Sequence, residues 1–161
     1  GLHGCYLVLS NLYGPGDHFS NELAHVIPAM IRKVHQAQIN NESSVTFWGD
    51  GTPTREFLYV KDAVAGIIKA LLQYDSTDPV NVGSSEEVSI KTVANLITKY
   101  MHFDGKVVWD TSKPNGQPRR RFTTNRAADQ FGFTASTLFE DGLKNTIDWY
   151  LEHADTQPVR G

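Results

Sequence analysis

Short apolar runs and apolar stripes with helical spacing alternate along this chain. The short runs predict β-strands over residues 5–10, 45–48, 55–60, 79–82 and 106–109. Four stripes predict helices: one that carries Ile27, Met30, Ile31 and Val34, one over 62–72, one that begins after an N-cap at Ser89, and one over 136–153. Strands that alternate with helices indicate an α/β fold.

The first predicted strand contains five consecutive apolar residues, from Cys5 to Leu9. Such a run is typical of a parallel strand that is covered on both faces. Residues 79–82 have the same character, so we expect the two segments to pair in parallel. Because a buried strand needs neighbours, we also expect the sequence to be a fragment of a longer chain. Residues 11–17 are rich in turn formers and predict a loop.

Residues 45–48 and 55–60 are separated by the turn sequence 49–53, which predicts a hairpin with a long loop. We expect Asp62 to cap the helix that follows. One side of that helix carries Val64, Ile67, Ile68 and Leu71. The inner side of the last helix carries Phe139, Leu143, Ile147, Tyr150 and Leu151.

The 161 residues include 15 basic and 18 acidic side chains, which give a net charge of −3, and 40% of the residues are hydrophobic. These values indicate a globular chain of domain size and disfavour a dedicated nucleic-acid binder. No apolar run is long enough to cross a membrane and no signal peptide is recognisable, so we expect a cytoplasmic protein. The single cysteine excludes an internal disulfide, and we expect no metal site.

Two motifs of dinucleotide chemistry are missing from these residues. The glycine pairs Gly14/Gly16 and Gly49/Gly51 do not extend to the GxGxxG fingerprint of a phosphate-binding turn. No tyrosine is followed four residues later by lysine, so the phenol–ammonium pair of proton transfer is also absent. The chain therefore contains no complete oxidoreductase site.

Four segments carry a family resemblance. Residues 11–19, 25–33 and 48–60 resemble the nucleotide-sugar half of the extended short-chain dehydrogenase/reductases, the NAD-dependent epimerase/dehydratase family. Residues 25–33 (HVIPAMIRK) combined with residues 112–120 (SKPNGQPRR) are most similar to the GDP-L-fucose synthase branch of that family. The resemblance extends over nearly the whole chain.

The resemblance implies the C-terminal, substrate-binding part of an extended short-chain dehydrogenase/reductase, with one or two leftover Rossmann strands. Residues 1–22 and 79–83 would then be late strands of a truncated Rossmann sheet with their loops. Residues 23–60 and 84–154 would form the nucleotide-sugar-binding domain, and 155–161 a tail.

The family resemblance also implies an activity for the whole protein. The Rossmann domain of such enzymes binds NADP and the smaller domain binds a GDP-sugar. The reaction converts GDP-4-keto-6-deoxy-mannose to GDP-L-fucose by 3,5-epimerisation and 4-reduction. We expect the whole protein to be a homodimer, and the fragment alone to be inactive.

Site residues follow from the same resemblance, position by position. His25 matches a catalytic acid/base, and a near-neutral imidazole suits proton transfer at a carbon next to a ketone. The expected cofactor-binding residues are Leu9, Ser10, Asn11, Leu12 and His25. The expected substrate-binding residues are Asn11, Lys33, Trp48, Arg55, Asn115 and Arg119. Arginine and lysine suit the diphosphate, and an indole can stack on a base or sugar.

Other interpretations of these residues stay open at this point. Taken alone, His25 is a helix cap or surface residue, Asn11 a turn former and Trp48 a core residue. The chain could belong to another nucleotide-sugar epimerase or dehydratase, because Asn115 stands where the branch usually has Asp. It could also be a non-catalytic interaction or RNA-binding module that uses the basic end of the polar loop 111–121, at Arg119–Arg121.

Overall fold

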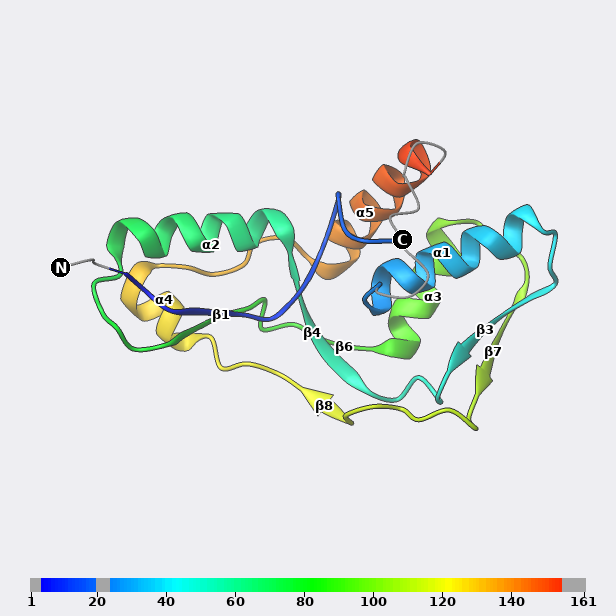
Figure 1. Ribbon diagram of the computed structural model, residues 1–161, viewed down its shortest axis with the longest axis horizontal. Helices are drawn as coiled ribbons and strands as arrows, with labels where there is room; N and C mark the ends of the chain where they lie inside the picture. Colours follow the sequence, from blue (N-terminus) through cyan, green and yellow to red (C-terminus); the bar gives the residue numbers. More distant parts are fainter. Residues whose placement is uncertain (1–3, 20–23, 155–161) are drawn as a thin grey trace.

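The computed structural model describes residues 4–19 and 24–154 (Figure 1). The elements are β1 (Leu7–Leu9), β2 (Asn11–Tyr13), α1 (Val26–Ile39), β3 (Ser44–Trp48), β4 (Thr54–Tyr59), α2 (Val60–Gln73), β5 (Val80–Val82), β6 (Glu87–Ser89), α3 (Ile90–Tyr100), β7 (Lys106–Asp110), β8 (Arg119–Arg120), α4 (Asn125–Phe131) and α5 (Phe139–His153). Helices α2 and α4 lie with β1 at one end of the molecule, and α1 and α3 lie with β3 and β7 at the other (Figure 1). The α/β fold class is confirmed.

Each end of the molecule has its own hydrophobic core. The smaller core lies between β5, α2 and α4 and includes Val80, Val82, Ala70 and Phe131. The larger core joins α1, α3 and α5 to the strands, and it is rich in aromatic side chains. Strand β4 contributes to both, because Leu58 belongs to the smaller core while Phe57 and Tyr59 belong to the larger one. The domain division that the resemblance implies stays a prediction.

The first two strands differ partly from expectation. Strand β1 pairs in parallel with β5, from Leu7 opposite Val80 to Leu9 opposite Val82, as predicted. The predicted loop over 11–17 is wrong at its start, because residues 11–13 form β2 and pair in parallel with β4. Tyr13 is buried there against Phe139. Long-range strand pairing and burial thus override the local turn preference.

The predicted hairpin of residues 45–48 with 55–60 is wrong. Strand β3 pairs in parallel with β7 over its whole length, whereas β4 pairs with β2, β6 and β8. The turn between β3 and β4 contains two glycines with positive φ, Gly49 and Gly51. A Cβ at Gly51 would lie 2.7 Å from the ring of Trp109 in β7, so a bulkier residue would not fit. The turn therefore redirects the chain into a different sheet.

Helix α2 is present as predicted, and its small residues rather than its large apolar ones face the protein. Its apolar residues Val64, Ile67, Ile68 and Leu71 are exposed, whereas Ala63, Gly66 and Ala70 are buried. A Cβ at Gly66 would lie 2.9 Å from Val82, so the glycine lets this face approach β5 closely. Small residues rather than large ones thus form the contact.

Asp62 does not cap helix α2, which begins at Val60. Its carboxylate is buried and instead accepts bonds from the backbone N–H of Thr137 at 3.0 Å and from the hydroxyl of Ser136 at 3.1 Å. The side chain therefore fastens the segment before α5 to α2.

The remaining helix predictions are mostly confirmed. Ser89 caps α3, because its hydroxyl oxygen accepts the N–H of Thr92 at 3.0 Å. The predicted inner residues of α5 are buried except Leu151, which is 43% exposed. The loop over 111–121 is not wholly irregular, since residues 119–120 form β8 beside β4. Helix α4 has no counterpart in the sequence prediction.

Candidate functional site

The elements place one set of predicted residues around a cavity of about 390 Å³. We call it the Arg55–Arg120 cavity. Its lining residues are Leu9, Ser10, Asn11, Leu12, His25, Val26, Ile27, Pro28, Arg55, Phe57 and Arg120. All five predicted cofactor-binding residues are among them, together with two predicted substrate residues, Arg55 and Asn11, of which Asn11 belongs to both sets.

The end of β1 and the start of β2 form one wall of this cavity. The N–H of Ser10 donates to the carbonyl of Val82 at 3.0 Å, which holds the strand end against β5. The Asn11 side chain donates from Nδ2 to the carbonyl of Glu56 at 2.8 Å, so its amide has a fixed orientation. The Oγ of Ser10 is buried and has no hydrogen-bond partner among the described residues. A buried hydroxyl beside a cavity is available for a polar group of a ligand.

Two arginines line the cavity from the neighbouring strands β4 and β8. Arg55 of β4 and Arg120 of β8 are register partners on adjacent parallel strands, and both side chains line the cavity. Nη1 of Arg55 donates to the carbonyl of Thr54 at 2.7 Å. None of the lining residues is acidic. Two adjacent guanidinium groups without a carboxylate among the cavity's lining residues favour binding of an anion.

His25 lies at the entrance to α1. It occupies the N-cap position but makes no side-chain capping hydrogen bond, and it is an exposed residue at the edge of the cavity. Burial raises the pKa of the nearby Asp17, and the charge of His25 acts in the opposite direction. The capping interpretation of His25 is therefore wrong, whereas its exposure agrees with the interpretation as a surface residue. His25 borders the same cavity as Asn11.

Trp48 and two lysines form a second cluster at the end of β3. The indole is 65% exposed, so it is not a core residue. Nζ of Lys33 lies 5.7 Å from the ring centre, and Nζ of Lys113 lies 5.9 Å from it. Lys33 also donates to the carbonyl of Thr46 at 3.2 Å. The cluster thus offers an exposed aromatic face with positive charge beside it.

Asn115 joins the turn after β3 to the loop before β8. Its Oδ1 accepts the N–H of Asp50 at 2.8 Å. A Cβ at Gly49 would lie 2.2 Å from the same oxygen, so this contact requires glycine. A Cβ at the next residue, Gly116, would lie 3.6 Å from Nη2 of Arg55. The loop thus runs from the turn beside Trp48 to Arg55.

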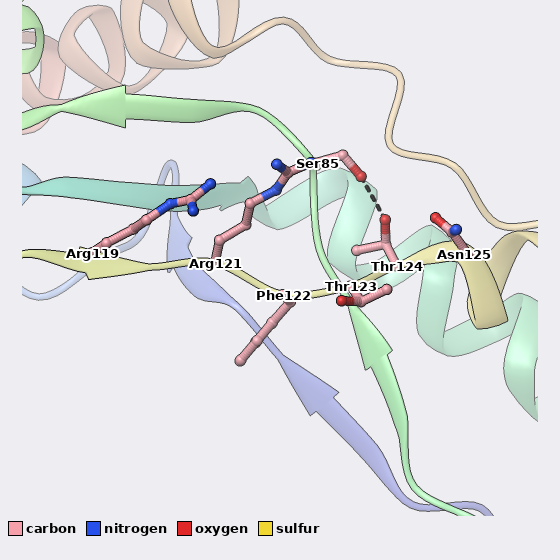
Figure 2. A pocket seen from close by; sticks show the side chains of 7 residues that line it. All are labelled: Ser85, Arg119, Arg121, Phe122, Thr123, Thr124 and Asn125. Carbon is pink, nitrogen blue, oxygen red and sulfur yellow. Dashed lines mark hydrogen bonds between the residues drawn. The ribbon is translucent and has the colours of Figure 1, made fainter.

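Arg119 is the predicted substrate residue that lies away from these two clusters. It pairs with Glu87, with Nε and Nη2 each 2.8 Å from a carboxylate oxygen. It lines a second cavity of about 600 Å³ together with Ser85, Arg121, Phe122, Thr123, Thr124 and Asn125. Figure 2 shows Arg119 and Arg121 on the same side of the strand, pointing toward the segment that carries Ser85. Arg120, between them, lines the other cavity.

The ion pair at Glu87 gives a pH prediction. Hydrogen bonds from Arg119 and then Thr54 lower the pKa of Glu87 from its usual 4.5 to about 2. A lowered pKa in the folded state stabilises the protein above the usual pKa, and this contribution is lost as pH falls toward the folded-state value. Wild type should therefore exceed Glu87→Gln in free energy of unfolding at neutral pH, and this difference should shrink between pH 4.5 and about 2. Urea unfolding across this range measures it, and a constant difference would contradict the prediction.

The described residues contain no helix long and apolar enough to cross a membrane. Within the same parts of the chain, no group of three or more His, Cys, Asp or Glu side chains could hold a metal ion.

Comparisons with known proteins agree with this architecture. A model of the NAD dependent epimerase/dehydratase family matches residues 1–83. GDP-L-fucose synthase 1 of Arabidopsis thaliana is 41% identical over 144 residues, which are 89% of this chain and 44% of that protein. GDP-L-fucose synthase of Escherichia coli is 39% identical over 155 residues, which cover 91% of this chain and 48% of that enzyme. The chain thus spans about half the length of these relatives.

Solved structures show the same relationship. The crystal structure of a GDP-L-fucose synthetase from Naegleria fowleri, bound to NADP, superimposes with a TM-score of 0.88 at 34% identity. The match covers 93% of this chain and 47% of that one. A UDP-glucose 4-epimerase from Thermotoga maritima has the same fold, with a TM-score of 0.81 at 22% identity. Sequence and fold together show that the chain belongs to the NAD-dependent epimerase/dehydratase family.

Proposed function

We propose that this chain is the GDP-sugar-binding part of an NADP-dependent GDP-4-keto-6-deoxy-mannose 3,5-epimerase/4-reductase. The observation that carries the proposal is the pairing of Arg55 with Arg120 along a cavity with no acidic lining residue. A diphosphate needs several converging donors, because water competes well for any single one. The similarity to GDP-L-fucose synthases supports guanine as the base.

The arrangement of the two clusters suggests how the substrate is held. The diphosphate is bound by Arg55 and Arg120, and the sugar extends toward Asn11 and His25 in the same cavity. The base extends toward the exposed indole of Trp48, where Lys33 and Lys113 contribute positive charge. Asn115 holds the loop between the two clusters.

The cofactor is bound in the same cavity, beside the end of β1 and the start of β2. Leu9, Ser10, Asn11 and Leu12 hold the nicotinamide end, and the unpartnered Oγ of Ser10 suits one of its polar groups. NADP, when bound, supplies the hydride for reduction. His25 transfers a proton at a sugar carbon next to the ketone, for which an imidazole is suited at neutral pH.

The interaction-module alternative finds less support in the structure. Its basic run, Arg119–Arg121, does not form one positive surface. Arg119 is paired with Glu87, and Arg120 lines a different cavity from its two neighbours. For the whole protein we propose a cytoplasmic location and a homodimer. Sedimentation of the longer chain would test the oligomeric state.

Titration calorimetry with GDP and UDP tests the proposed function. The wild-type chain should bind GDP in preference to UDP. Equal and weak binding of the two nucleotides would contradict the proposal.

Two variants should separate the roles of Trp48 and His25. Trp48→Ala should weaken GDP binding about tenfold, since stacking on a base contributes roughly 1–3 kcal/mol. His25→Ala should leave GDP affinity unchanged, because its proposed partner is a sugar carbon that GDP lacks. The same calorimetric titration measures both variants. A large loss with His25→Ala, or none with Trp48→Ala, would contradict this arrangement.

A further inference from the structure

Glu56 is a buried carboxylate at the centre of the molecule, between Arg55 and Phe57 on β4. It is only 1% exposed. Its Oε2 accepts the N–H of Phe122 at 2.9 Å, and its Oε1 accepts the N–H of Ser85 at 3.2 Å. Its backbone carbonyl accepts the side-chain amide of Asn11 at 2.8 Å. One residue thus joins three segments that are distant in sequence.

The surrounding backbone is shaped around this carboxylate. A Cβ at Gly83 would lie 1.9 Å from Oε1 of Glu56, so the close approach requires glycine at that position. Ser85 has a φ of 64°, a left-handed conformation that is uncommon for serine. Its hydroxyl is hydrogen-bonded to Thr124, two residues beyond Phe122 (Figure 2).

Strand alternation explains why Glu56 can act on the Arg55–Arg120 cavity without lining it. Successive side chains of a strand point to opposite faces. Arg55 lines the cavity, so Glu56 projects from the other face of β4, where it reaches Phe122.

Strand β8 is short, and besides its pairing with β4 it is held by the ion pair of Arg119 with Glu87. It is two residues long and pairs with β4 at two register positions, which place Arg120 opposite Arg55. Its side chains are exposed. The bond from Phe122 to Glu56 fixes the chain two residues after Arg120, and the N–H of Thr54 donates to the carbonyl of Pro118 at 2.9 Å on the other side.

We propose that Glu56 is a positioning residue for the nucleotide site. Its carboxylate clamps Phe122 and Ser85 so that Arg120 stands beside Arg55, and its carbonyl orients Asn11. We call the hydrogen bonds of the Glu56 carboxylate with Phe122 and Ser85 the clamp. The effect of the clamp on nucleotide binding rests on the proposed function, whereas the hydrogen bonds themselves do not.

Two variants of the 161-residue chain disturb the clamp in different ways. Glu56→Gln keeps the size but replaces one acceptor oxygen by an NH₂ group, so only one of the two N–H groups can be satisfied. Gly83→Ala keeps the carboxylate but displaces it. Asp62→Asn is the matched control, because Asp62 is also a buried carboxylate that accepts backbone N–H groups, at Ser136 and Thr137.

Amide exchange by NMR and GDP calorimetry are the two measurements. In both clamp variants the amides of Phe122 and Ser85 should exchange at least about tenfold faster, and GDP should bind about ten- to a hundredfold more weakly. Asp62→Asn should instead accelerate exchange at Ser136 and Thr137 and leave GDP affinity unchanged. This contrast separates positioning from a general loss of stability.

The two claims can fail separately. If wild type does not bind GDP, the proposed function fails, and faster exchange at Phe122 in the clamp variants would still support the clamp. If GDP binds and either clamp variant folds with unchanged exchange at Phe122 or unchanged GDP affinity, the positioning role of Glu56 is overturned. Equal loss of GDP affinity in Asp62→Asn would overturn it as well.

Discussion

Arg55→Ala is expected to weaken GDP binding by the chain about ten- to a hundredfold, because a charge-assisted hydrogen bond in a partly desolvated site contributes roughly 1.5–3 kcal/mol. Arg55 is half-buried on β4 and stands in register with Arg120. Its removal leaves one guanidinium to bind two phosphates. Arg55→Lys should restore only part of the affinity, since an ammonium group cannot reproduce a planar, bidentate contact. Calorimetry with GDP measures both variants.

Arg126→Ala is the control for this experiment. Arg126 is an exposed arginine that pairs with Asp78 at 2.9 Å and donates to the carbonyl of Pro79, and it does not line the Arg55–Arg120 cavity. Arg126→Ala removes one positive charge, as Arg55→Ala does, so nonspecific attraction of the nucleotide would fall equally in both variants. Equal affinities for Arg126→Ala and Arg55→Ala would exclude a specific role for Arg55.

The second prediction with a large effect is that the chain alone does not catalyse reduction of the 4-keto sugar nucleotide. The chain alone, mixed with NADPH and the 4-keto sugar nucleotide, should show no loss of nicotinamide absorbance. Its 161 residues contain neither a GxGxxG turn nor a tyrosine followed four residues later by lysine. The described part of the cofactor wall is limited to the ends of β1 and β2. The Escherichia coli GDP-L-fucose synthase serves as the positive control, and turnover by this chain would contradict the prediction.

The spacing of apolar residues predicted where helices form better than it predicted which side of each helix is buried. The stripe Ile27, Met30, Ile31 and Val34 is buried in α1 as its spacing indicates. In α2 the apolar residues that the spacing groups on one side are exposed, because Gly66 and Ala70 allow a closer contact with the neighbouring strand than the large side chains would. The spacing of apolar residues shows that a helix has an apolar side, but the element that packs against the helix decides which side is buried.

The parallel pairing of β1 with β5 was predicted, but the partners of β3 and β4 were not. The apolar residues of 45–48 and the glycine turn after them fit a hairpin, yet β3 finds its partner in β7, about 60 residues later. Pairing of this kind depends on how the whole chain packs, and no local signal in either segment encodes it.

Several residues that the family resemblance selected lie close together in the structure, and their roles stay predictions. Asn11, His25 and Arg55 lie around one cavity, and Lys33 lies beside Trp48. Arg120 and Glu56 were not selected. Alternation along a strand would place Arg119 and Arg120 on opposite faces, but the polar sequence of residues 111–121 predicts a loop, in which alternation does not apply. The role of Glu56 depends on contacts with Ser85 and Phe122 that only the folded structure reveals.

Amide hydrogen exchange of the wild-type chain with and without saturating GDP tests the central claim most directly. Binding should slow exchange in two segments, 46–56 and 113–121, which carry Trp48, Arg55 and Arg120. Exchange in α2 should not change, because that helix contributes no residue to either cluster. Protection centred on Ser85 and residues 122–125, which line the second cavity, or no protection at all, would contradict the proposed nucleotide site.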